Sequence, residues 1–185
     1  MRKIFIDCGY NMGNVTDLFQ EKNKQNYEYF AFEANPYIYK KVKSRHPFCK
    51  LENKAVWIKD STVPFYVIEL DKNESKSRFM SGASTLNKKK AEWNELGHRK
   101  QIEINVDCID FSSFILNNFD RKDEIIVKMD IEGAEYEVLG KMIAEDSISY
   151  INDLIIEFHD DRTEKDSGPI KKELENKGVK VKIWH

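Results

Sequence analysis

Residues 4–19 read IFIDCGYNMGNVTDLF and contain the first structural unit that the sequence predicts. The run at 4–6 is short, apolar and rich in β-forming residues, and it stops at Asp7, as a buried strand does. The turn-like segment 9–13 follows, and apolar residues then recur at helical spacing over 14–19. Strand, glycine turn and helix therefore come in this order at the start of the chain.

The same order of strand and helix recurs along the chain. Apolar runs that end at polar residues alternate with segments of helical periodicity, and Pro36 and Pro169 each suit a first helical turn. Such alternation favours a doubly wound α/β fold, in which helices cover both faces of a mostly parallel sheet. We expect one domain over residues 1–185, with further strands at 29–32, 51–57, 63–68, 102–106, 125–129, 154–156 and 179–183, and further helices around 36–45, 110–118, 135–142 and 169–177.

The composition fits an ordinary folded domain. Of the 185 residues 41% are hydrophobic, and the formal net charge of -2 at pH 7 excludes the basic field of a dedicated nucleic-acid-binding protein. Cys8, Cys49 and Cys108 show no spacing typical of zinc ligands or of a disulfide framework. No stretch approaches the roughly 18 apolar residues that a membrane span needs. We therefore expect a soluble, cytoplasmic protein without a membrane span.

The segment at 71–100 differs from the rest of the chain. It holds eight Lys or Arg residues against four Asp or Glu residues, and it lacks the alternation of a strand until Ile102. We expect a long excursion that is partly helical over 88–96. Because the remaining chain supplies little beyond the sheet and its helices, this excursion is the candidate lid over a substrate.

Polar side chains follow the predicted strands at their carboxyl ends. In a doubly wound sheet the ligand crevice lies outside these ends, near the point where the strand order reverses. Residues far apart in the sequence should therefore meet at one edge of the sheet. They are Asp7, Gly9, Gly13, Glu33, Asn35, Asn53, Lys54, Asp130, Glu132, Glu157 and His159.

Two of these positions have a spacing typical of nucleoside binding. Gly9 lets the backbone approach a ligand without a Cβ in the way, and Glu33, 24 positions later, suits the hydroxyls of a ribose. Asn11 stands where dinucleotide-binding enzymes carry the second glycine that accommodates a pyrophosphate. The pattern favours a nucleoside ligand without a pyrophosphate, and an NAD-type oxidoreductase is the less favoured alternative.

Four blocks of the sequence resemble the FkbM-type S-adenosylmethionine (SAM) methyltransferases. They are residues 5–13 (FIDCGYNMG), 32–36 (FEANP), 81–86 (SGASTL) and 128–135 (KMDIEGAE). The resemblance implies a Rossmann-like, SAM-dependent methyltransferase that acts on a hydroxyl oxygen of a sugar, a glycan or another small molecule. A SAM-fold binding or accessory protein without turnover is the alternative from another class.

The resemblance also implies roles for single residues. The turn at 7–13 would hold the methionine end of SAM, Glu33 the ribose, and Asn53 or its neighbours would flank the adenine. Asp130 and Glu132 would lie close to the positively charged sulfur, which a carboxylate favours. The implied cofactor residues are Asp7, Gly9, Tyr10, Asn11, Gly13, Glu33, Ala34, Asn35, Asn53, Ser84, Asp130 and Glu132.

Methyl transfer to a hydroxyl is an in-line displacement in which a base need only take a proton. His159 is the first choice for this base because an ordinary imidazole titrates near neutrality, and Asp130 and Glu157 are its rivals. In the simpler alternative, His159 is a plain loop residue and the acids only favour a helix N-terminus. A hard cation such as Mg²⁺ on Asp130, Glu157, Asp160 or His159 is a further alternative, and no metal is assigned.

Overall fold

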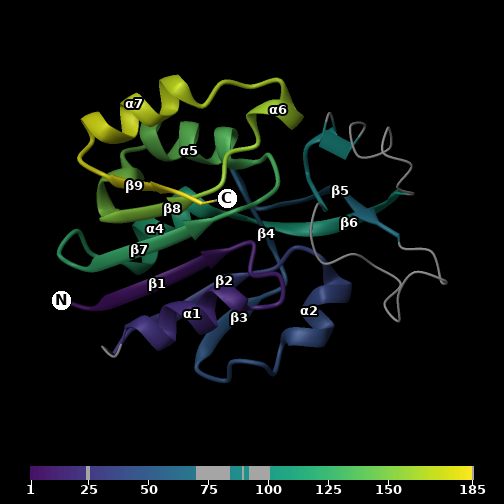
Figure 1. The fold of residues 1–185 in the computed structure, drawn as a ribbon, viewed down its shortest axis with the longest axis horizontal. Helices are drawn as coiled ribbons and strands as arrows, with labels where there is room; N and C mark the ends of the chain where they lie inside the picture. Colours follow the sequence, from purple (N-terminus) through teal and green to yellow (C-terminus); the bar gives the residue numbers. More distant parts are fainter. Residues whose placement is uncertain (24–25, 70–83, 89, 92–100, 185) are drawn as a thin grey trace.

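The computed structural model describes residues 1–23, 26–69, 84–88, 90–91 and 101–184. Its central sheet has six parallel strands in the order β3-β2-β1-β7-β8-β9 (Figure 1). The expected doubly wound, mostly parallel α/β fold is thereby confirmed. The six strands are β1 (Lys3–Cys8), β2 (Glu28–Phe32), β3 (Cys49–Glu52), β7 (Glu124–Met129), β8 (Asp153–Ile156) and β9 (Lys180–Ile183).

The strand order reverses beside β1. From β1 the chain moves outward to β2 and β3, and it later returns to the other side of β1 with β7, β8 and β9. Cys8, the last residue of β1, pairs with Phe32 of β2 on one side and with Met129 of β7 on the other. The carboxyl ends of β1 and β7 therefore flank the switch point, which is where open α/β sheets bind ligands.

Helices cover both faces of the central sheet (Figure 1). On one face, α4 (Phe111–Asn118), α5 (Glu135–Ala144) and α7 (Gly168–Asn176) pack with Ile4 and Ile6 in the largest apolar cluster. On the other face lie α1 (Asn14–Lys22) and α2 (Pro36–Val42), and Phe5 stacks on Phe19 of α1 with ring centroids 3.9 Å apart. β1 is thus covered on both sides, which explains its continuous apolar run. Two short elements, η1 (Ser147–Tyr150) and α6 (Asp160–Thr163), flank β8 in the sequence.

A second sheet of three strands departs from the sequence prediction. The single strand predicted over 51–57 is wrong, because the chain bends at Asn53 and divides this run into β3 and β4 (Ala55–Trp57). β4 pairs with β6 (Gln101–Asp110), which also pairs with the antiparallel β5 (Ser61–Ile68). Apolar residues lie on both sides of the bend, so hydrophobicity alone does not reveal the change of sheet.

The charged segment at 71–100 is described only in part. Thr85 forms an isolated antiparallel bridge with Tyr66, and Lys88, Lys90 and Ala91 are helical. The rest of the segment, and with it most of the expected lid, lies outside the described residues. Within the part of the chain that the structure describes, no helix is both long and apolar enough to cross a membrane.

Replacing Gly9 tests how closely β1 and β7 approach at the switch point. Gly9 has a φ of +81°, and a Cβ there would overlap the backbone oxygen of Asp130. We expect Gly9→Ala to lower the free energy of unfolding by about 2–5 kcal/mol, because the left-handed conformation and the clash both cost energy. Urea unfolding at equilibrium measures this change.

Gly140→Ala is the matched control. Gly140 lies in α5, and no atom lies within 4 Å of a Cβ built there. We expect this variant to gain about 0.5–1 kcal/mol, because alanine has the higher helix propensity. Equal effects of the two substitutions would contradict the close approach at Gly9.

Candidate active site

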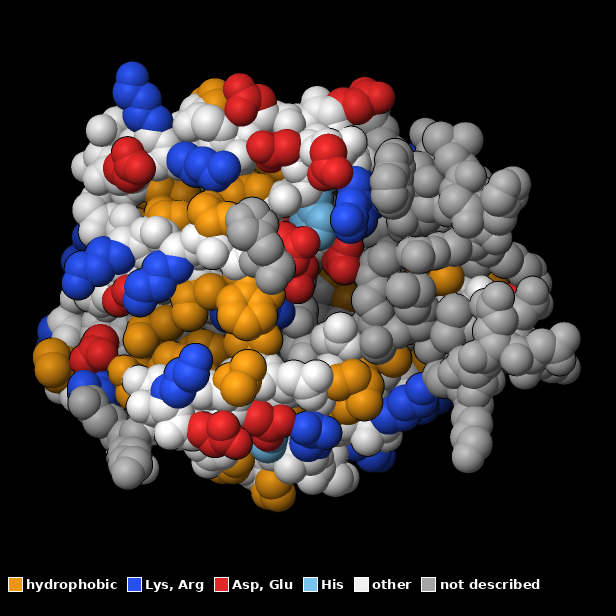
Figure 2. All heavy atoms as spheres, in the orientation of Figure 1, with side chains coloured by type: hydrophobic (Ala, Val, Ile, Leu, Met, Phe, Trp, Pro, Cys, Tyr) orange, Lys and Arg blue, Asp and Glu red, His pale blue; other side chains and the backbone are white. Residues whose placement is uncertain are grey.

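A pocket lies at the carboxyl edge of the central sheet, beside the switch point. It holds about 560 Å³ of empty space, part of it open to solvent, which is in the range of small-molecule sites. Gly9, Glu33 and Asp130 line it together, although they follow three different strands. Figure 2 shows acidic side chains gathered around a histidine in a hollow of this face of the molecule.

The turn after β1 is held by its own backbone. The backbone nitrogens of Gly9 and Tyr10 both donate to the carbonyl oxygen of Phe32, at 3.1 and 2.9 Å, and tie the turn to the end of β2. Asn11 follows with a φ of 52° and lines the pocket. Backbone hydrogen bonds of the protein itself therefore hold this turn at the edge of the pocket.

Tyr10 and Gly13 support this turn from the side of α1 and α2. The Tyr10 hydroxyl lies 2.5 Å from Nδ1 of His46, and Nε2 of His46 lies 2.7 Å from Oδ1 of Asp17. The Tyr10 ring packs where a Cβ on Gly13 would lie. Both residues thus shape the turn from behind and are not part of the pocket wall.

Glu33 connects the two turns that border the pocket. Its carboxylate accepts hydrogen bonds from the backbone nitrogens of Asn11, at 2.7 Å, and Asn35, at 2.8 Å. Burial raises the pKa of Glu33 to about 7, although the two hydrogen bonds lower it. Each carboxylate oxygen has a second lone pair, so a ligand hydroxyl can also donate to it.

Asn35 and Asn53 hold the backbone around Glu33. The Asn35 side chain accepts from the backbone nitrogen of Tyr37 at 3.0 Å and caps α2. The Asn53 amide donates to the carbonyl oxygens of Glu33 and Ala34, at 2.7 and 3.2 Å. Both amides therefore position a segment that lines the pocket.

A buried ion pair, which the sequence patterns do not predict, lies behind the β1 turn. Nζ of Lys128 lies 3.3 Å from Oδ1 of Asp7 and donates to the carbonyl oxygen of Gly9 at 2.7 Å. The Thr16 hydroxyl also donates to Asp7, at 2.9 Å. Burial raises the pKa of Asp7; burial lowers the pKa of Lys128, but the charges of Asp7 and Asp130 outweigh this and raise it overall. The only sequence signal for this pair is a lysine near the end of an otherwise apolar strand.

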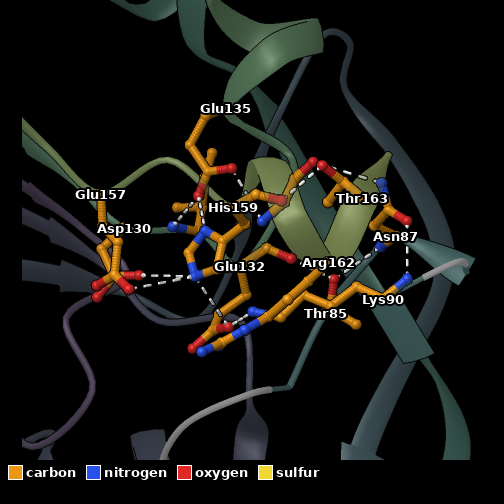
Figure 3. A network of polar contacts seen from close by, with 12 residues as sticks. Thr85, Asn87, Lys90, Asp130, Glu132, Glu135, Glu157, His159, Arg162 and Thr163 are labelled. Atoms are coloured by element: carbon orange, nitrogen blue, oxygen red, sulfur yellow. Dashed lines mark hydrogen bonds and ion pairs between the residues drawn. The ribbon is translucent and has the colours of Figure 1, made fainter. Parts of the chain in front are cut away.

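Acidic side chains surround His159 where β7 and β8 end (Figure 3). The imidazole is 3% exposed, and its Nδ1 lies 3.2 Å from Oε1 of the fully buried Glu135. Nε2 lies 3.4 Å from Oε2 of Glu132, 3.7 Å from Oε1 of Glu157 and 4.0 Å from Oδ1 of Asp130. One buried histidine is thus shared among four carboxylates.

Residues of the charged segment enclose Glu132. Lys90 is buried and forms an ion pair with the Glu132 carboxylate, and burial lowers the pKa of Lys90 to about 8. The Thr85 hydroxyl donates to the Glu132 carbonyl oxygen at 2.5 Å. Asp160, which the sequence offered as a possible cation ligand, instead accepts from the Ser167 hydroxyl at 2.7 Å.

The structure divides the predicted residues between the pocket wall and its support. Of the three predicted catalytic residues, Asp130 lines the pocket, whereas Glu157 and His159 lie outside its wall, with Nε2 of the buried His159 within 4.0 Å of both acids. The predicted cofactor residues in the wall are Gly9, Asn11, Glu33, Ala34, Ser84, Asp130 and Glu132. The others, which make the supporting contacts above, are Asp7, Tyr10, Gly13, Asn35 and Asn53.

The sequence patterns do not predict the apolar part of the pocket wall. Ala55 and Val56 come from β4, and Phe65 comes from β5, so the second sheet contributes one side of the pocket. In the sequence these residues look like ordinary core positions. No local signal separates them from the core, because only the pairing of the second sheet brings them to the pocket.

A parallel sheet whose switch point borders a glycine turn and a buried acid is typical of Rossmann-like α/β proteins. Within this class, the chain belongs to the family of FkbM methyltransferase domains, whose model matches residues 7–181. The match covers nearly the whole chain, confirms the resemblance seen in the sequence and supports an enzyme that transfers methyl groups. No curated protein and no solved structure gives a match.

Removing the Lys128 charge tests the ion pair behind the turn. Lys128→Met leaves Asp7 buried without its counter-charge, so we expect the free energy of unfolding to fall by about 3–5 kcal/mol. The control is Lys182→Met, since Lys182 is 63% exposed and pairs with Asp153 at 3.0 Å. Urea unfolding should show a loss within about 1 kcal/mol for the control, and a loss that small for Lys128→Met would contradict a structural role.

Glu33 also makes the stability depend on pH. Its pKa is about 7 in the folded protein against an ordinary value of 4.5, so between these values the folded state holds the proton more tightly than the unfolded chain. Stability therefore falls as the pH rises through this window. We expect the wild type to lose on the order of 3 kcal/mol more than Glu33→Gln between pH 4.5 and pH 7.5. Urea unfolding across this range measures the difference. Parallel profiles of stability against pH for the two proteins would contradict the raised pKa of the buried Glu33 carboxyl.

Proposed function

We propose that the protein transfers a methyl group from SAM to a hydroxyl oxygen of a sugar, a glycan or a similar small molecule. The observation that carries this proposal is the shared pocket of Gly9, Glu33 and Asp130 at the switch point. When bound, SAM supplies a methyl group on a positively charged sulfur, from which an acceptor oxygen can displace it in line. The side chains of the pocket would bind and align the two substrates and take up the acceptor proton.

The described residues fit the separate parts of SAM. Glu33 offers carboxylate oxygens to the ribose hydroxyls, and Val56 and Phe65 offer an apolar surface to the adenine. Oδ1 of Asn11 is buried and has no hydrogen-bond partner among the described residues. Because a buried acceptor is costly when unsatisfied, this oxygen suits the amino group at the methionine end.

Asp130 is the acid that would meet the acceptor. Its side chain lines the pocket and is 26% exposed, whereas His159 behind it is almost fully buried. Hydrogen bonding of Nδ1 to Glu135 leaves Nε2 of His159 facing Asp130. As the new carbon–oxygen bond forms, the oxygen–hydrogen bond of the acceptor breaks, and its proton passes to the Asp130 and His159 pair. Alignment of the two substrates in the pocket would supply most of the rate.

A second hollow supports a polar acceptor. It shares Leu86 with the cofactor pocket, and its wall includes Trp57, Asn87, Lys88, Thr163 and Lys165. Amide, hydroxyl and ammonium groups can bond to several hydroxyls of one molecule, while the Trp57 ring can pack on its apolar face. This combination suits a sugar or glycan better than an apolar acceptor.

Calorimetry and a transfer assay test the proposal. We expect S-adenosylhomocysteine to bind in an isothermal titration and NAD⁺ to give no heat, because Asn11 occupies the place that a pyrophosphate needs. Methyl transfer from labelled SAM to a panel of sugars then tests turnover. Failure of S-adenosylhomocysteine to bind would contradict the proposed cofactor, and binding without transfer to any acceptor would favour the accessory protein.

Glu33→Ala tests the ribose contact. We expect S-adenosylhomocysteine to bind about 10- to 100-fold more weakly, since the variant loses one or two hydrogen bonds to a charged group. The matched control is Glu28→Ala at the opposite end of β2, where Glu28 lies 3.8 Å from Lys50 on the surface. Titration calorimetry on both variants, after circular dichroism confirms that they fold, gives the comparison. Wild-type affinity of the Glu33 variant would contradict the ribose role.

A further inference from the structure

We infer that Asp130, Glu157 and Nε2 of His159 bind a divalent cation at the border of the cofactor pocket. The geometry of these side chains supports the cation site, and the role of the cation in catalysis rests on the proposed function. The sequence offered such a cation only as an alternative. Two observations favour a cation here. Nδ1 of the imidazole is held by Glu135, and Nε2 faces several carboxylates.

The distances around Nε2 are too long for hydrogen bonds and short enough for a shared cation. Nε2 lies 3.4 Å from Oε2 of Glu132, 3.7 Å from Oε1 of Glu157 and 4.0 Å from Oδ1 of Asp130, whereas hydrogen bonds from nitrogen to oxygen measure about 2.7–3.2 Å. Donor atoms that each lie ~2.1 Å from one ion are separated by at most ~4.2 Å. The separations of Nε2 from Glu157 and from Asp130 satisfy this limit, and ligand atoms of Asp130, Glu135 and His159 all lie within 4.8 Å of one another.

The other ring nitrogen of His159, Nδ1, is held as it is in metal-bound histidines. Nδ1 lies 3.2 Å from Oε1 of Glu135, and the Glu135 carboxylate accepts from the backbone nitrogens of Ile131 and Gly133, at 3.0 and 2.9 Å. Glu135 is therefore an acceptor to which Nδ1–H donates, and in the neutral imidazole this leaves the lone pair on Nε2. Histidine ligands of metals usually donate their second N–H to a carboxylate in this way.

A buried oxygen without a hydrogen-bond partner lies beside this nitrogen. The His159 side chain is 3% exposed, and its Nε2 lies 3.4–4.0 Å from carboxylate oxygens of Glu132, Glu157 and Asp130. Oδ1 of Asp130 is buried and lacks a hydrogen-bond partner in the described part of the chain. An unsatisfied oxygen among several carboxylates and an imidazole indicates an ion or a solvent molecule at this place.

The nearby lysines, Lys90 and Lys128, form ion pairs with other acids. Lys90 forms an ion pair with Glu132, and Lys128 lies closer to Asp7, at 3.3 Å, than to Oδ2 of Asp130, at 3.7 Å. Among the described residues, His159 is the one basic side chain within 4.0 Å of the Glu157 carboxylate. A divalent cation would add to the positive charge beside Asp130 and Glu157.

The donor types indicate the kind of ion and its use. One imidazole nitrogen with carboxylate oxygens suits a divalent cation that accepts both donors, and Mn²⁺ is a suitable probe. Because Asp130 lines the pocket, the ion would be open to an acceptor hydroxyl on that side. Binding of that oxygen to the ion would lower the pKa of the hydroxyl, and the released proton would pass to solvent. With the cation bound, His159 would be a ligand rather than a base, so the cation would replace the Asp130 and His159 pair as the group that promotes loss of the acceptor proton.

Titration of the full chain with Mn²⁺, after treatment with a chelator and without SAM, tests the site. Electron paramagnetic resonance measures free Mn²⁺, and we expect saturable binding to the wild type. Asp130→Asn and Glu157→Gln should each weaken it by ~10-fold or more, because each removes a charged ligand, and Glu135→Gln by ~10- to 100-fold, because it releases the imidazole. Both ligand side chains are more than 25% exposed, so these two variants are expected to fold.

Asp161→Asn is the matched control, because Asp161 lies in α6, is 80% exposed and has Arg162 at 4.0 Å as its ion-pair partner. This variant should bind Mn²⁺ as the wild type does. Absence of saturable binding, or equal binding by the wild type, Asp130→Asn and Glu157→Gln, overturns the inference. Calorimetry with S-adenosylhomocysteine, run separately, tells the two proposals apart. Mn²⁺ binding without cofactor binding would retain the cation site and reject the proposed cofactor. Cofactor binding without Mn²⁺ binding would retain the proposed cofactor and reject the cation site.

Discussion

The contact of the Lys128 ammonium with Asp7 and with the Gly9 carbonyl is the interaction on which the site depends. It joins β1, β7 and the turn between β1 and α1 in one buried group. A buried ammonium is stable only with its counter-charge, so the two strands and the turn must keep their relative positions. The Gly9 amide is held from the other side by the Phe32 carbonyl. Contacts within the protein therefore hold the turn, which would lower the cost of aligning a ligand there.

The carboxylates at this edge of the sheet fall into two groups. Glu33 and Glu135 are buried and accept hydrogen bonds from backbone nitrogens, so the fold fixes the position of each side chain. Asp130 and Glu157 have no such backbone support among the described residues and face His159. The first group maintains the geometry, and the second group leaves negative charge for chemistry. Both the proposed proton transfer and the proposed cation use this second group.

Prediction from the sequence worked best where one strand and its neighbouring turn carry the whole signal. The buried run of β1, the turn at Gly9 and the acid at Glu33 are local patterns, and the family match over residues 7–181 agrees with them. The run at 51–57 failed because the change from the central sheet to the second sheet occurs within a continuous apolar stretch. The sequence places Asn53 or its neighbours beside the adenine; the Asn53 amide holds the carbonyl oxygens of Glu33 and Ala34, and Lys54 and Ala55 line the pocket.

By itself, the sequence determined most of the order of strands and helices, the polar residues at the strand ends and the family of the protein, because periodicity and motif spacing are local properties. The tertiary structure decided which of those residues face the pocket and which support it. It paired Lys128 with Asp7, brought Phe65 to the pocket wall and placed His159 behind Asp130. These contacts depend on strand pairing between segments far apart in the chain. No local pattern encodes which distant residue a buried side chain contacts.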